Sequence, residues 1–251
     1  MPVILWTAQH FCRVTRSFLS LKIPALAVVL TLFTSCSVGA ASFQATLVDA
    51  QGKPVDGGVI TLQGPTDAPL PAQTAIMDQV QKQFQPSVLA VHTSTKVSFP
   101  NSDNIRHQVY SFSPAKRFEL RLYEGTPSEP ITFDKPGAVV LGCNIHDWMV
   151  GYIYVTDDPW FAVTDATGVV KLQLPAGHYN VTLWHPRSPD LLPQKGGELT
   201  LSEKDASQRY AVNLTAGSDE SEEHEEHDEH YPEKPSAFGD AFKKAASETK
   251  E

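Results

Sequence analysis

The stretch CNIHDWM, which runs from Cys143 to Met149, decides how the rest of the chain is interpreted. It places a thiol, an imidazole and a thioether at C-x-x-H-x-x-M spacing. Apolar and β-branched residues flank it at 138–143 and 151–156, so we expect a strand on each side. A loop this short between two strands can turn the side chains of Cys143, His146 and Met149 toward one point, which makes the stretch a candidate metal site.

A second imidazole, that of His107, lies upstream at the start of another predicted strand. Two imidazoles and a thiolate in one plane, with a weakly bound methionine, form the ligand set of blue-copper electron-transfer sites. The soft thiolate favours Cu(I) and the imidazoles suit Cu(II), so such a site accepts both oxidation states. The candidate site therefore contains Cys143, His146 and Met149, with His107 as the candidate second imidazole, and the expected cofactor is one type 1 copper ion.

The surroundings of both segments resemble the cupredoxins, in particular plastocyanin, pseudoazurin and amicyanin. The first ligand region of the family contains Phe-x-Asn-x-Asp before the histidine, and this chain has FPNSD at 99–103 before His107. The second region contains Phe, then Pro-Gly, then the Cys-His-Met loop and a Gly. This chain matches it with Phe133, Pro136-Gly137 and Gly151 around that loop. The short loop is most similar to that of amicyanin.

The resemblance implies a cupredoxin Greek-key β-sandwich at 75–157. It also selects His107 as a ligand, because His92, His178 and His185 lack such flanks and are interpreted as structural histidines.

This chain departs from the family beside the ligands. Gln108 stands where the family has Asn, Asn144 stands where it has a hydroxyl residue, and Trp148 replaces a small or apolar neighbour. Residues next to the ligands tune ligand geometry and redox potential, so the site is expected to differ from its relatives in potential or colour.

The flanking segments show a second resemblance, to carboxypeptidase regulatory-like (transthyretin-like) β-sandwiches. VDAQGKPV at 48–55 is similar to the opening of that module, and TDATG at 164–168, followed by strand-like residues, is similar to its second half. The two pieces, 42–70 and 160–215, lie on either side of the cupredoxin segment. We therefore expect the cupredoxin domain to be inserted into this sandwich or packed against it.

Short strand-like segments separated by turn residues predict an all-β fold along most of the chain. One segment, 76–85, is instead interpreted as a short helix or an irregular connection. The predicted strands are 43–49, 59–62, 88–99, 108–112, 118–122, 130–133, 138–143, 151–156, 161–164, 169–174, 179–184, 199–201 and 210–214.

The first 40 residues have the pattern of a secretory signal peptide. A basic stretch precedes the apolar run 25–33, and small residues follow at 37–41. The apolar run is shorter than the roughly 20 residues that a membrane anchor needs. The expected location is therefore the periplasm. A loose lipobox ending at Cys36 leaves lipidation and membrane tethering as the alternative.

Cleavage near residue 40 removes two of the three cysteines, Cys12 and Cys36, and leaves Cys143 without a disulfide partner. Metal ligation explains an exported lone thiol, and a buried inert thiol is the alternative.

The segment 218–251 begins with a run of acidic residues that carries His224, His227 and His230. Such a block repels itself and lacks apolar surface, so a disordered tail is predicted. Its histidines either bind metal weakly or are solvated.

Three functions fit these patterns. The first is a single-electron carrier whose partners are periplasmic redox proteins, a cytochrome or a dehydrogenase. By analogy with the family, His146 would be the exit ligand. Proteins of this build are often labelled methylamine-utilisation proteins. The alternatives are copper storage or delivery, which the His-rich tail and the extra sandwich motivate, and a binding module with a vestigial site.

An enzyme is disfavoured, because four protein ligands leave no open metal position for a substrate. The net charge of −9 argues against nucleic acid as a partner.

Overall fold

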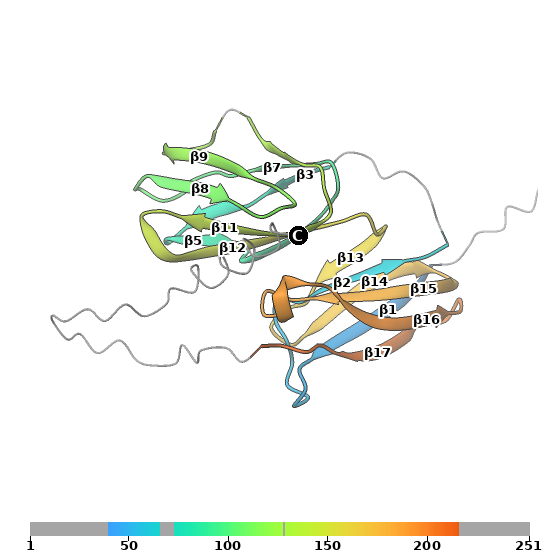
Figure 1. Cartoon of the computed structure of the whole chain (residues 1–251). Coiled ribbons are helices and arrows are strands. Elements are labelled where there is room, and N and C mark those ends of the chain that lie inside the picture. Colours follow the sequence, from blue (N-terminus) through green and yellow to red (C-terminus); the bar gives the residue numbers. More distant parts are fainter. Residues whose placement is uncertain (1–39, 66–72, 128, 216–251) are drawn as a thin grey trace, which may run out of the picture. The chain divides into compact units, whose positions relative to one another are not determined.

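The computed structural model describes residues 40–65, 73–127 and 129–215 (Figure 1). The regular elements in these ranges are strands, apart from one turn of 3-10 helix, Pro189–Leu191. The predicted all-β fold class is thereby confirmed. The predicted leader as far as residue 39, Cys36 within it, and the predicted tail 218–251 lie outside the described residues. Within the described ranges, no helix has the length and apolar character needed to cross a membrane.

Two sheets share one hydrophobic core, and together they form what we call the outer sandwich. The three-stranded sheet has the order β14-β1-β17, and the four-stranded sheet has the order β13-β2-β15-β16. Their strands are β1 (Ala40–Val48), β2 (Val59–Gln63), β13 (Trp160–Val163), β14 (Val169–Pro175), β15 (Gly177–Trp184), β16 (Gln194–Leu201) and β17 (Ala206–Ala211). On β1, Phe43, Ala45 and Leu47 alternate with more exposed residues and face this core, as the two-residue period of a strand requires.

The remaining strands form the inserted sandwich, which carries the predicted metal ligands. A three-stranded sheet has the order β10-β7-β3 and a five-stranded sheet the order β6-β12-β11-β8-β9, with a small β4–β5 hairpin beside them. The strands are β3 (Thr74–Ile76), β4 (Asp78–Val80), β5 (Gln83–Gln85), β6 (Val88–His92), β7 (Thr95–Ser98), β8 (His107–Ser111), β9 (Phe118–Tyr123), β10 (Ile131–Phe133), β11 (Gly137–Cys143) and β12 (His146–Thr156).

The connection between the two sandwiches is an insertion. Strands β2 and β13 are antiparallel neighbours, with Leu62 opposite Trp160 and Val59 opposite Val163. All strands from β3 to β12 lie between them in the sequence. The chain therefore leaves the outer sandwich and re-enters it at adjacent points (Figure 1). Of the two arrangements expected from the sequence, insertion is the one observed.

The helical interpretation of 76–85 is wrong. These residues begin with Ile76, the last residue of β3, and then form the β4–β5 hairpin with its two-residue turn, Gln81-Lys82, in which φ is 53° and 58°. Positive φ at both central residues is the type I′ geometry that joins two strands tightly. Gln and Lys seldom adopt it, so the composition of the segment does not reveal the turn.

Two other expectations about strands also need correction. The predicted strand 88–99 is two strands in different sheets, β6 and β7, separated at Ser94, where φ is 72°. The strand predicted at 199–201 begins earlier, at Gln194, and includes a bulge opposite Val181 and Thr182 that accommodates Gly197 at a φ of 94°.

Candidate metal centre

Three neighbouring strands bring the predicted ligands to one end of the five-stranded sheet. Cys143 is the last residue of β11, His146 is the first of β12, and His107 is the first of β8. Strand β11 lies between the other two and is antiparallel to both. The end of β11 therefore meets the beginnings of β12 and β8, although His107 is 36 residues away from Cys143 in the sequence.

The imidazoles of His107 and His146 both turn their Nδ1 atoms toward the thiol. Each Nδ1 lies 3.8 Å from Cys143 Sγ, and the two rings are 5.0 Å apart between centroids. The possible ligand atoms of the three residues all lie within 4.8 Å of one another. His107 and Cys143 are buried and His146 is partly exposed.

This spacing leaves room for a metal ion that contacts both nitrogens and the sulfur. For bonds of about 2.0–2.1 Å to nitrogen and about 2.3 Å to sulfur, as zinc makes, a nitrogen–sulfur separation of 3.8 Å corresponds to an angle of about 120° at the ion. Two imidazoles and one thiolate are also the donor set that suits copper in both oxidation states. The residues present therefore fit a copper ion.

Met149, the fourth predicted ligand, is on the same strand as His146 and is 1% exposed. It belongs to the same buried cluster as Cys143, together with Met77, Phe84 and Leu141. Its sulfur is thus enclosed in the core of the inserted sandwich, and its role as the weak axial ligand stays a prediction.

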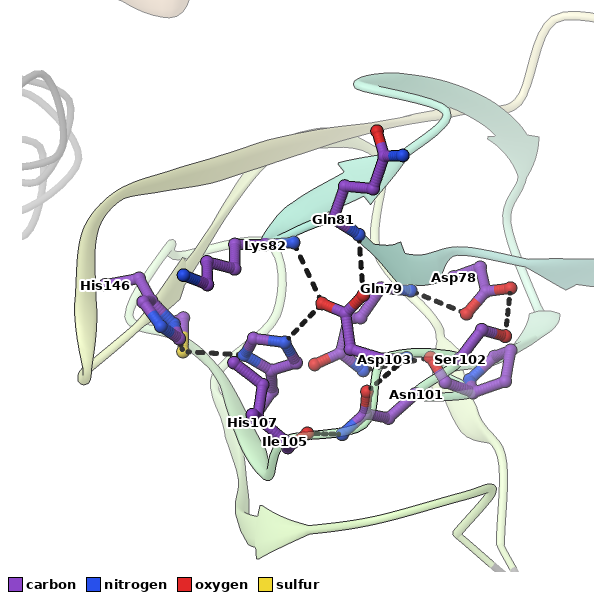
Figure 2. A network of polar contacts seen from close by, with 12 residues as sticks. Asp78, Gln79, Gln81, Lys82, Asn101, Ser102, Asp103, Ile105, His107 and His146 are labelled. Carbon is purple, nitrogen blue, oxygen red and sulfur yellow. Dashed lines mark hydrogen bonds and ion pairs between the residues drawn. The ribbon is translucent and has the colours of Figure 1, made fainter.

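A network of polar contacts surrounds His107 on the side away from the thiol (Figure 2). Its Nε2 lies 2.7 Å from Asp103 Oδ2. The same carboxylate accepts hydrogen bonds from the backbone N–H groups of Gln81 at 2.6 Å and Lys82 at 2.8 Å. Asn101 accepts a hydrogen bond from the backbone N–H of Asp103 at 3.1 Å.

These contacts are reflected in the ionisation of the site. Burial opposes the charge on Asp103, but the Lys82 N–H, the His107 imidazole and the Gln81 N–H outweigh it and hold the pKa of the carboxyl below its usual range. Burial, with the nearby His107 and the Lys82 ammonium, lowers the pKa of His146. A lowered pKa favours the neutral imidazole, the form that can bind a metal.

Exposed apolar side chains and a lysine lie beside the site. Trp148 and Ile145 are exposed, and the Trp148 ring lies 5.4 Å from that of His146. The side chain of Lys82 extends from the β4–β5 turn toward His146 (Figure 2).

Sequence reasoning found the thiol and both imidazoles but assigned no role to Asp103, Gln81 or Lys82. Asp103 was visible as the last residue of FPNSD, four positions before His107. No composition signal marked the Gln81-Lys82 turn.

No protein-family model matches this chain, and no curated protein matches it. Among solved structures, the chain is similar to a purple cupredoxin from Nitrosopumilus maritimus, at 22% identity and a TM-score of 0.29. That likeness covers 34% of this chain and 100% of the cupredoxin. A reduced amicyanin variant is 18% identical with a TM-score of 0.30, over 38% of this chain and 99% of the amicyanin.

A copper-containing nitrite reductase from Thermus scotoductus SA-01 is 27% identical with a TM-score of 0.31. It aligns over 46% of this chain but only 28% of the reductase. Scores of this size are too low to transfer a function from these proteins to this chain.

Proposed function

We propose that this chain is a periplasmic type 1 copper protein that carries single electrons between redox partners, and that it is not an enzyme. The observation that carries the proposal is the convergence of His107 Nδ1 and His146 Nδ1 on Cys143 Sγ at 3.8 Å each. Bound copper would supply a one-electron change between Cu(II) and Cu(I).

The protein's own contribution is a rigid and largely dry set of donor atoms. His107 is fully buried and Cys143 is 3% exposed, so these two side chains have little freedom to move and little contact with water. Strand pairing fixes the backbone at both residues. Donor atoms that hold still during a change of oxidation state suit electron transfer better than metal release.

His146 supplies the route to a partner, because it is the site imidazole that is partly exposed. The exposed side chains of Trp148 and Ile145 beside it offer apolar surface for brief contact with another protein. The partners proposed are a periplasmic cytochrome or dehydrogenase. Export is supported by the leader pattern, and membrane attachment would require lipidation at Cys36.

The test uses the chain without its predicted leader, loaded with one equivalent of Cu(II). We expect an intense visible absorption band, a spin-resonance spectrum with narrow copper hyperfine splitting, and one reversible electrochemical wave. Cys143→Ser should abolish the visible band, because the thiolate–copper interaction produces it. The matched control is His178→Ala, which changes a histidine outside the site and should leave the spectrum intact.

Copper storage or delivery is the second candidate, supported by the histidines of the acidic segment after residue 217. It predicts a different result in the same experiment. Copper would pass readily to a competing chelator and no reversible wave would appear, and that outcome would contradict the electron-carrier proposal.

A further inference from the structure

His107 is held at both ring nitrogens. Its Nδ1 faces Cys143 Sγ at 3.8 Å, and its Nε2 lies 2.7 Å from Asp103 Oδ2 (Figure 2). An ionised carboxylate can only accept a hydrogen bond, so Nε2 carries the proton and donates it to Asp103. The lone pair of the ring is thereby placed on Nδ1, the atom that faces the thiol.

Asp103 is itself fixed by parts of the chain outside the strands that hold the ligands. The backbone N–H groups of Gln81 and Lys82 converge on its two carboxylate oxygens. They can do so because both residues have positive φ, which turns consecutive N–H groups to one side and forms a small anion-binding nest.

The segment that carries Asp103 is anchored as well. Asn101 accepts a hydrogen bond from the Asp103 N–H, and its side-chain amide donates to the carbonyl oxygens of Ile105 and Tyr123 at 2.8 and 2.9 Å. The carboxylate is therefore held on one side by the β4–β5 hairpin and on the other by the loop before β8. Little freedom is left to the carboxylate or to the imidazole that it contacts.

We propose that Asp103 is a positioning residue that fixes the His107 ring and its tautomer and sets the reduction potential of the site. This inference rests on the proposed copper-binding function. A carboxylate hydrogen-bonded to a ligand imidazole makes that imidazole a stronger electron donor. A stronger donor stabilises Cu(II) more than Cu(I), so Asp103 lowers the reduction potential.

The test compares Asp103→Asn with wild type in the copper-loaded chain. Asn retains the shape and one acceptor oxygen but removes the charge. We expect the variant to bind Cu(II) about 10–100-fold more weakly, the range seen when such partners are changed. If the preference for Cu(II) over Cu(I) falls tenfold, the potential rises by about 59 mV for one electron.

Asp78→Asn is the matched control. Asp78 belongs to the same network and accepts hydrogen bonds from the Gln79 N–H at 2.7 Å and the Ser102 hydroxyl at 2.8 Å, and the change removes the same charge. It should leave the potential at the wild-type value. An equal shift in both variants would overturn the inference, because the effect would then be a general loss of charge.

A second measurement separates positioning from simple loop anchoring. In the Cu(I)-loaded chain, nitrogen NMR should show a protonated, slowly exchanging Nε2 at His107, and that proton should exchange rapidly in Asp103→Ala. A lower melting temperature in Asp103→Asn with an unchanged potential would overturn the inference and leave the copper function standing. Absence of the type 1 spectrum in wild type would instead overturn the proposed function and this inference with it.

Discussion

Cys143 reaches the candidate site through a local break in strand pairing. Strands β11 and β12 pair regularly from Gly137 to Gly142, and the register then shifts so that Cys143 lies opposite His146. Three residues of β12, Asp147 to Met149, are thereby left without a partner on β11, and an irregularity of this kind bends a strand. Residues that lie opposite each other on antiparallel strands have their side chains on the same face, so the thiol and the imidazole can face the same point.

Met149 offers the sharpest residue-scale prediction about the ligand set. Met149→Leu nearly conserves volume, so the free energy of unfolding should fall by less than about 1.5 kcal/mol. Loss of the thioether removes a weak donor that tunes the potential of such sites. We expect copper to stay bound and the reduction potential to rise on the order of 59 mV, a tenfold change in relative affinity.

Met77→Leu is the control for this substitution. Met77 is as deeply buried as Met149 and belongs to the same cluster, but it lies outside the predicted ligand set. It should have a similar effect on stability with no change in potential. A potential that moves equally in both variants would remove Met149 from the ligand set.

At the scale of elements, the strands and the ligand loop were predictable and the supports around them were not. The C-x-x-H-x-x-M spacing located the thiol and the imidazole because the chemistry lies in the residue types themselves. The support of Asp103 depends instead on the backbone of Gln81 and Lys82, and any residue carries an N–H group. Only their positive φ directs those groups at the carboxylate, and single-residue propensity does not report it.

His185, the residue that follows β15, is held in its neutral form by its surroundings. His185 Nδ1 accepts a hydrogen bond from the Arg187 N–H at 3.0 Å, and its Nε2 lies 3.1 Å from the carbonyl oxygen of Asp56. Accepting at Nδ1 requires the neutral ring, and donating to the Asp56 carbonyl places its proton on Nε2. Burial, with the charge of Arg187, lowers the pKa of His185 to about 4.

This lowered pKa predicts a pH dependence of stability. Above pH 6.5 the ring is neutral in both folded and unfolded chains. As the pH falls from 6.5 to about 4, His185 becomes protonated in the unfolded chain but stays largely neutral in the folded chain. The free energy of unfolding therefore decreases. The loss reaches about 3 kcal/mol at pH 4, since each pKa unit corresponds to about 1.4 kcal/mol.

Urea unfolding of the copper-free chain at several pH values checks this prediction. His185→Gln removes the titrating group, so its stability should fall less steeply than that of wild type between pH 6.5 and 4. The remaining slope belongs to other groups, which are the same in both proteins. Parallel curves for the two proteins would show that His185 does not titrate in this way.

For the molecule as a whole, the insertion between β2 and β13 follows from a pairing that the sequence only suggested. The flanks at 42–70 and 160–215 each resemble part of one β-sandwich module. That pattern is expected whether the segment between them is inserted into the module or packed against it. The antiparallel register of Leu62 with Trp160 distinguishes them. Pairing between residues almost a hundred positions apart depends on tertiary packing, which no local window contains.

A third buried cluster contains residues of both sandwiches: Val59, Trp184 and Leu191 of the outer one, and Val88, Val140 and Tyr154 of the inserted one. The fully buried Trp184 ring stacks on Tyr154, with 4.9 Å between centroids, and its indole N–H donates to the Leu191 carbonyl at 2.7 Å. Tyr154 belongs to β12, the strand that begins with His146. The strand that carries the site is thus also packed against the outer sandwich.

Trp184→Ala should therefore destabilise the molecule without altering its metal centre. Replacing a buried Trp by Ala costs about 3–5 kcal/mol, and here an indole hydrogen bond is lost as well. Tyr154 pairs with Ala138, at the opposite end of the β11–β12 pair from Cys143 and His146, so the copper spectrum of the folded variant should match wild type.

Trp148→Ala makes the same chemical change at an exposed site, where Trp148 is 65% exposed, and should alter stability by no more than about 0.5 kcal/mol. Thermal unfolding and the visible spectrum of both variants measure these effects. A changed spectrum in Trp184→Ala would mean that packing between the sandwiches also determines the geometry of the ligands.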